Sequence, residues 1–171
     1  MKKNTTLSIF LIIITITTAC SSKTDKEMYE AAEQYKQDEN FTEAVAEFES
    51  LINDFPESQF IPRAYFEIGM IYQGQLVKNI GPTESFEMAI KNYRAIFERF
   101  PDNPDAPNSL FMVGFIQANE LNQLDSAKST YNLFIKKYPN HELKASAQAE
   151  IENLGLAPEE ILKKKMSSTK K

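Results

Sequence analysis

The side chains that most often carry out chemistry in proteins are scarce in this sequence. Its 171 residues include no Trp, five Gly, one His (His141) and one Cys (Cys20). A Cys/His metal site, a Cys-His dyad or a Ser-His-Asp triad would each need His141, and a single Cys excludes a disulfide within one chain. We therefore expect no catalytic residues, no metal site, no cofactor and no small-molecule substrate. His141 is interpreted as a linker residue.

The charge balance excludes another class of function. The chain has 19 Lys and Arg against 24 Asp and Glu, which gives a formal net charge of -5 at pH 7. Nucleic-acid binding depends on clustered Lys and Arg side chains that neutralise phosphates. We therefore expect no nucleic-acid partner. The hydrophobic fraction of 42% and the charged fraction of 25% are typical of one globular domain.

A hydrophobic run at residues 7–16 is too short to span a bilayer as a stable helix. Lys2 and Lys3 precede it, and the small residues Thr17, Thr18 and Ala19 follow it. A basic start, a short apolar run and small residues at its end are typical of a signal peptide. We therefore predict that residues 1–19 are a signal peptide.

The segment from Thr17 to Cys20, followed by Ser21, resembles the lipobox of bacterial lipoproteins. The resemblance implies cleavage before Cys20 and lipidation of its thiol and its new amino group. Several acyl chains on one residue anchor a protein stably to a membrane. It also implies sorting to the outer membrane, and residues 20–26 would be the lipidated tether. The alternatives are a secretory signal with an incidental Cys, or a buried free Cys.

Three segments of the chain share one pattern and end in an aromatic residue followed by Pro56, Pro101 or Pro139. Residues at fixed distances before each proline match in all three. The twelfth residue back is Ala44, Ala89 or Ala127; the eighth is Phe48, Tyr93 or Tyr131; the fifth is Leu51, Ile96 or Phe134; and the fourth is Ile52, Phe97 or Ile135. These offsets lie on one face of an α-helix, and proline ends the helix because it lacks an N–H group.

A second apolar segment precedes each of these helices, at residues 28–37, 61–73 and 108–119. Each contains a small residue (Ala32, Gly69 or Gly114) that would let the partner helix approach closely. The order small residue, aromatic, Ala, aromatic, Pro resembles the tetratricopeptide repeat, in three copies over residues 26–139. The resemblance implies an all-α superhelix of three helical hairpins. An unrelated helical bundle is the alternative.

The rest of the chain is expected to close the repeat stack. Residues 143–154 are predicted to form a capping helix, so the repeat domain would cover residues 27–156. Residues 157–171 would be a short helix and a basic tail in which the lysines fray, or which contacts anionic lipid or an acidic partner. The insertion at residues 74–82 would fold onto its own hairpin or form a partner-binding loop.

In tetratricopeptide proteins, the first helix of each repeat lines a groove that binds partners. Carried over by position, the resemblance implies a partner-binding groove formed by Tyr29, Glu33, Lys36, Arg63, Phe66, Met70, Gln73, Asn108, Phe111, Phe115 and Asn119. Phe66, Met70, Phe111 and Phe115 would form an apolar strip on this groove, which suits adaptable peptide contacts. The alternative is that superhelical curvature or the C-terminal helices bury the strip.

The combination of lipobox, short tether and repeats ending in Phe-Pro or Tyr-Pro resembles the BamD-like lipoproteins of the outer-membrane β-barrel assembly machine. It resembles less closely the periplasmic repeat protein of the Tol-Pal system. The resemblance implies a non-catalytic scaffold, anchored to the periplasmic face of the outer membrane by lipid, that holds a peptide segment of an envelope protein. The alternatives are an accessory subunit that positions a cell-wall or proteolytic enzyme, and a self-assembling structural lipoprotein.

Overall fold

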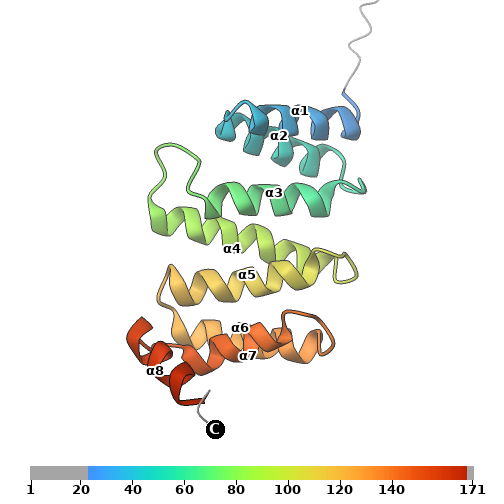
Figure 1. Ribbon diagram of the computed structural model, residues 1–171. Helices are drawn as coiled ribbons and strands as arrows, with labels where there is room; N and C mark the ends of the chain where they lie inside the picture. Colours follow the sequence, from blue (N-terminus) through green and yellow to red (C-terminus); the bar gives the residue numbers. More distant parts are fainter. Residues whose placement is uncertain (1–22, 169–171) are drawn as a thin grey trace, which may run out of the picture.

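A computed structural model describes residues 23–168 of the chain, so the predicted signal peptide and Cys20 lie outside the described residues. Within that range every regular element is an α-helix (Figure 1). In chain order the helices are α1 (Asp25–Gln37), α2 (Phe41–Asp54), α3 (Ile61–Gln73), α4 (Pro82–Arg99), α5 (Ala106–Asn119), α6 (Leu124–Lys137), α7 (Lys144–Asn153) and α8 (Pro158–Ser168). The predicted all-α, tetratricopeptide-like superhelix is confirmed.

The helices pack as a stack of hairpins. Helix α1 packs on α2, α3 on α4, and α5 on α6, while α2–α3, α4–α5 and α6–α7 contacts join successive hairpins. Figure 1 shows the hairpins following one another along the length of the molecule, with α1 at one end and α8 at the other. A single hairpin cannot bury its apolar face, and stacking supplies the missing contacts.

Local sequence signals set several of the helix ends. Thr24 begins α1 with a capping box, in which its side chain accepts a hydrogen bond from the Glu27 backbone N–H at 3.2 Å. The Glu27 carboxylate in turn accepts one from the Thr24 backbone N–H at 2.7 Å. The second helix of each hairpin ends two residues before a proline, as the sequence pattern predicts.

The core is formed by the residues that repeat along the sequence. Ala44, Ala89 and Ala127 have an exposed fraction of 0%, which is what a contact point between two helices requires. Gly69 and Gly114 face the buried aromatic residue of their own hairpin. A Cβ built on Gly69 would lie 2.7 Å from Tyr93 Cε1, and one on Gly114 would lie 2.8 Å from Tyr131 Cε1. The small residue and the aromatic residue of the pattern are therefore in direct contact.

The insertion between α3 and α4 folds back onto the protein. Val77 and Ile80 are partly buried and pack against the core, whereas Leu76 is 42% exposed. Leu76 and Lys78 also border a small cavity together with residues 39–43, the turn between α1 and α2 and the start of α2. The loop thus reaches the turn of the preceding hairpin as well as its own.

The C-terminal part contains more helix than we expected. Helix α7 packs on α6 in the position of the predicted capping helix. Helix α8 continues through residues 163–165, so the expectation that these lysines lie in a frayed tail is wrong. Glu159 and Glu160 occupy its first turn, where acidic side chains complement the helix dipole. The Glu160 carboxylate also accepts a hydrogen bond from the Ala157 backbone N–H at 2.9 Å.

His141 lies in the turn between α6 and α7, as expected of a linker residue. Its Nδ1 accepts a hydrogen bond from the Leu143 backbone N–H at 3.2 Å, and its ring meets the edge of Phe134 with 5.7 Å between the centroids. These contacts hold the turn against the third hairpin.

Candidate functional site

The predicted partner-binding residues lie on α1, α3 and α5, the first helices of the three hairpins. We call the surface formed by these residues the first-helix face. Side-chain contacts join α1 to α3 across this face and extend to the start of α5. The face is therefore one continuous surface, although consecutive first helices are separated in sequence by a whole second helix.

An ion-pair network connects the first two hairpins on this face. Lys36 Nζ on α1 lies 2.6 Å from one carboxylate oxygen of Glu67 on α3, and 2.8 Å from Glu33 Oε1. Arg63 Nη2 lies 2.6 Å from the other carboxylate oxygen of Glu67. Arg63 also approaches Asp105, just before α5, at 3.9 Å. Glu67 thus holds one cation on each of its two oxygens.

Burial makes Glu67 the centre of this network. Its side chain is only 1% exposed, and a buried carboxylate is costly unless cations and hydrogen bonds compensate for the lost water. Burial alone would lower the pKa of Lys36, but hydrogen bonds to Glu33 and Glu67 outweigh it and leave the pKa raised. Lys36 therefore stays charged throughout the physiological pH range. Arg63 remains 47% exposed, so part of its guanidinium group faces solvent.

Glu67 and Asp105 were not among the residues predicted from the sequence. Glu67 follows Arg63 by four residues on one helix, and oppositely charged side chains at this spacing are neighbours on a helix surface. The spacing of four residues would therefore have allowed the ion pair between Arg63 and Glu67 to be predicted from the sequence. Asp105 precedes α5, and its distance from Arg63 depends on how the hairpins stack.

The predicted apolar strip is only partly exposed. Phe66 packs edge-on against Tyr93 with 5.6 Å between ring centroids, and the Arg63 guanidinium lies 5.2 Å from the Phe66 ring centre. Phe111 packs against Tyr131, with 5.4 Å between centroids, and also contacts the core. Phe115 is half-buried, whereas Met70 is 40% exposed. Among these four side chains, Met70 offers the most open contact surface.

Several other predicted residues make contacts within the protein. Tyr29 stacks on Phe60 with 4.9 Å between ring centroids. The Gln73 side-chain oxygen accepts a hydrogen bond from the Tyr93 hydroxyl at 2.9 Å. The Asn119 side-chain amide donates to the Phe115 carbonyl at 3.0 Å, and Asn108 is half-buried.

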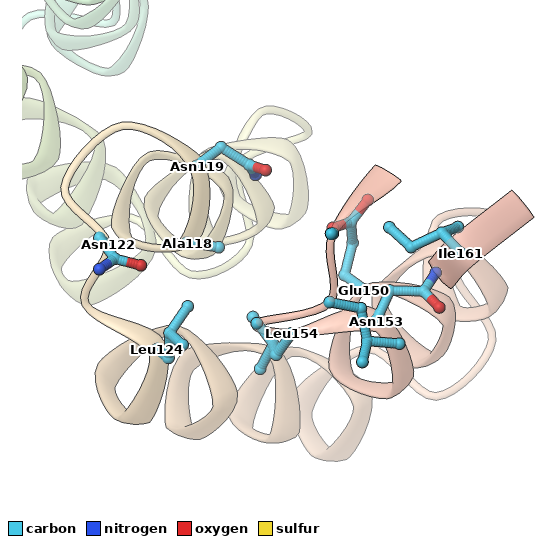
Figure 2. A pocket seen from close by; sticks show the side chains of 11 residues that line it. Ala118, Asn119, Asn122, Leu124, Glu150, Asn153, Leu154 and Ile161 are labelled. Carbon is cyan, nitrogen blue, oxygen red and sulfur yellow. The ribbon is translucent and has the colours of Figure 1, made fainter. Parts of the chain in front are cut away.

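A cavity of about 410 Å³ lies at the C-terminal end of the stack, between α5, α6, α7 and α8. Figure 2 shows Ala118 and Asn119 of α5 on one side and Glu150 and Ile161 on the other. Asn119 belongs to the predicted groove, so the cavity adjoins the first-helix face. No motif in the sequence pointed to this cavity.

Residues 23–168 contain neither a helix that could span a membrane nor a cluster of metal-binding side chains. No helix in this stretch has the length and hydropathy that a membrane span requires. The same stretch holds no group of three or more His, Cys, Asp or Glu side chains placed to bind a metal ion.

Comparison with known proteins identifies the family of the chain. No curated protein sequence matches it. The family model YfiO, described as an outer membrane lipoprotein, matches residues 21–162. The match begins directly after Cys20, includes all three hairpins and extends into α8. Because it covers most of the sequence, the chain belongs to the YfiO family of outer membrane lipoproteins.

Proposed function

We propose that this protein is a non-catalytic scaffold, held at the periplasmic face of the outer membrane by lipid on Cys20, that binds a peptide segment of an envelope protein on its first-helix face. We further propose that this binding serves the assembly of outer-membrane proteins. The family match supports the outer-membrane location and the lipoprotein character. The identity of the partner and the role in outer-membrane protein assembly are our proposal.

The ion-pair network on the first-helix face is the observation that carries the proposal. Glu67 fixes Lys36 and Arg63 in place before any partner arrives, because each cation is already bound to one of its oxygens. Side chains that are fixed in advance lose little conformational entropy on binding, which favours affinity. The exposed part of Arg63 can pair with a carboxylate or a backbone carbonyl of a bound segment.

Met70 supplies an apolar contact on the same helix as Arg63. Its side chain is 40% exposed, and methionine adapts to apolar partners of different shape because it is flexible and polarisable. A charged anchor and an adaptable apolar contact, two turns apart on one helix, suit a peptide with both polar and apolar side chains.

The proposed lipid anchor on Cys20 lies only a few residues before the first helix of the folded domain. Helix α1 begins at Asp25, five residues after Cys20. Such a short tether would keep the first hairpin close to the membrane surface. The first-helix face would then lie within reach of proteins at that surface.

Site-specific photo-crosslinking in intact cells tests the proposal. A photoreactive residue is placed at Met70, and a matched control is placed at Lys91, an exposed residue on α4, which is a second helix. We expect a crosslinked envelope protein from Met70 and none from Lys91. A captured component of outer-membrane protein assembly would support the complete proposal.

Other results would contradict parts of the proposal. Capture of a second copy of this chain would favour a self-assembling lipoprotein, and capture of a cell-wall or proteolytic enzyme would favour an accessory subunit. If Met70 captures nothing while Lys91 captures a protein, binding on the first-helix face is refuted.

A further inference from the structure

Helix α8 exposes two apolar side chains on one face. Leu162 and Met166 are each 59% exposed, the highest value among the large exposed hydrophobic side chains of residues 23–168. They are four residues apart, so they lie beside each other on the helix surface. Ile161 is half-buried and lines the cavity between α8 and the other helices. The two exposed residues, which we call the α8 apolar pair, thus lie on a different side of α8 from the side that meets the stack.

Lysine positions border the α8 apolar pair. Residues advance by about 100° around an α-helix, so positions 163 and 165 lie about 60° to either side of the pair. Both are lysines, and Lys163 is exposed. The acidic residues of α8, Glu159 and Glu160, are in its first turn, where the helix dipole stabilises them. An apolar strip bordered by lysines is typical of a helix that lies in the interface of a membrane.

Positive charge is concentrated at this end of the chain. Residues 158–171 contain five of the 19 Lys and Arg residues but only two of the 24 Asp and Glu residues. Because the whole chain has a formal net charge of -5, the part before α8 is strongly acidic. An anionic surface therefore attracts the C-terminal segment and repels most of the remaining chain. This charge distribution favours α8 as the point of contact with such a surface.

The family of the chain indicates which anionic surface is within reach. The chain belongs to a family of outer membrane lipoproteins, so a phospholipid surface lies close to it. Figure 1 shows α8 at the end of the stack opposite α1, the helix that follows the proposed lipid anchor. With an attachment at each end, the stack would lie along the membrane. The first attachment raises the effective concentration of lipid around α8, which favours the second.

We propose that α8 binds anionic phospholipids at the membrane surface. The α8 apolar pair enters the boundary between headgroups and acyl chains, and the lysines of the segment interact with lipid phosphates. With 11 residues, α8 is about 16 Å long, so it lies on the bilayer and does not span it. An acidic protein surface matches only the lysines, whereas an anionic bilayer matches both the lysines and the apolar pair.

This inference goes beyond the proposed function. It rests on α8 and on the outer-membrane location of the family, and not on the ion-pair network of the first-helix face. An unsuccessful crosslinking experiment at Met70 would therefore leave it unaffected.

Vesicle flotation tests the inference with the full mature chain. The Cys20→Ser form, produced without the signal peptide, carries no lipid, so its binding reports the polypeptide alone. Vesicles of phosphatidylethanolamine and phosphatidylglycerol are compared with vesicles of phosphatidylcholine, which have no net charge. We expect at least about tenfold tighter binding to the anionic vesicles, because each lysine near such a surface contributes about fivefold. Added salt should weaken this binding by screening the charges.

Two substitutions in the α8 apolar pair test its contact with lipid. Leu162→Gln combined with Met166→Gln should weaken binding to the anionic vesicles by about tenfold, because the apolar contribution is lost. Leu133→Gln is the matched control, since Leu133 is an exposed leucine on α6 with an exposed fraction of 45%. It should bind like the unsubstituted chain. Circular dichroism checks that each variant keeps its helices.

A second pair of substitutions tests the lysines. Lys163→Gln combined with Lys165→Gln should weaken binding to the anionic vesicles by at least about tenfold. The control removes two exposed lysines from other helices, Lys91→Gln on α4 and Lys128→Gln on α6. It changes the net charge by the same amount and should have little effect on binding.

A tryptophan probe tests the contact in the anchored protein. The chain contains no Trp, so Met166→Trp introduces a single indole. The lipidated mature chain is reconstituted into the anionic vesicles, and brominated phospholipids, which quench indole fluorescence on contact, are added to the bilayer. We expect strong quenching and a blue-shifted emission for Met166→Trp. Leu133→Trp is the control and should show neither.

Several results would overturn the inference. It fails if the lipid-free chain binds both kinds of vesicle equally or binds neither. It also fails if the double variant of the apolar pair or that of the lysines binds like the unsubstituted chain. Absence of quenching for Met166→Trp in the lipidated chain would exclude the contact in the anchored protein. Crosslinking of position 162 to an acidic protein in cells, without vesicle binding, would instead identify α8 as a protein-binding element.

Discussion

Replacing Gly69 with Ala tests how tightly the second hairpin is packed. In an exposed helix, this change stabilises a protein by up to about 1 kcal/mol, because glycine has more conformational freedom to lose on folding. At Gly69 the added Cβ would lie 2.7 Å from Cε1 and 2.9 Å from Cδ1 of Tyr93. Non-bonded carbon atoms prefer a separation of about 3.5 to 4.0 Å, so the ring would have to move by about 1 Å.

The surroundings of Tyr93 oppose such a movement. The residue is 1% exposed, its hydroxyl is bound to Gln73, and Phe66 packs against its ring. Overpacking of a core costs about 1 to 3 kcal/mol, which exceeds the gain from removing a glycine. We therefore expect Gly69→Ala to lower the free energy of unfolding by about 1 kcal/mol, measured from the midpoint of urea denaturation followed by circular dichroism.

Gly81→Ala is the matched control. No atom lies within 4 Å of a Cβ built on Gly81, and its φ of -70° is available to alanine. We expect its free energy of unfolding to change by no more than about 0.5 kcal/mol. If Gly69→Ala instead raised the midpoint, as an ordinary helical glycine replacement does, the close contact between Gly69 and Tyr93 would be refuted.

Three further predictions concern packing, titration and anchoring. Ala89→Leu should lower the free energy of unfolding by about 1 to 3 kcal/mol, because Ala89 is completely buried between helices; an unchanged denaturation midpoint would contradict this packing. Burial raises the pKa of Tyr93 and Tyr131 above the ordinary value of 10.0, so the stability from keeping them neutral should be complete below pH 10 and decline above it. A denaturation midpoint that does not decline above pH 10 would refute this. Cys20→Ser should abolish incorporation of a fatty-acid probe in growing cells; an unmodified protein that takes up no probe would exclude lipidation.

The sequence predicts the repeat architecture well because its signals are local. Proline ends a helix through its own missing N–H, and the aromatic and alanine positions lie on one helix face by periodicity alone. Helix α3 therefore has the same bounds, Ile61–Gln73, as the segment predicted from apolar spacing. Helix α1 begins three residues earlier than its predicted segment, because the Thr24 capping box extends it.

The first-helix face was only partly predictable because its contacts cross between hairpins. The repeat pattern places Lys36 and Arg63 on this face, but it does not identify which carboxylate lies between them. Glu67 takes that position because α1 and α3 stack at a particular offset, and that offset results from the packing of the whole hairpins. The same stacking half-buries Phe66 and Phe111, which the sequence left open between groove and core.

The C-terminal region was the least predictable part of the chain. Helix α8 has no counterpart in the repeats, and the three lysines within it suggested an unstructured tail. The cavity beside α8 depends on four helices that meet at the end of the stack, and no local pattern encodes their relative positions. Gly155, with φ of 77°, turns the chain between α7 and α8 and lies 3.2 Å from Leu124, measured from an ideal Cβ.

Equivalent positions can be compared between the repeats of one protein. The comparison distinguishes residues that packing requires from residues that packing leaves free to serve another role. Tyr93 and Tyr131 press against their glycines at nearly the same distance, so packing fixes this part of both hairpins. The same packing does not require Ala118, because the second hairpin accommodates Gln73 at the equivalent position and gains a hydrogen bond from it. The third hairpin lacks that bond, and among residues 23–168 the Tyr131 hydroxyl is buried without a hydrogen-bond partner, which costs stability.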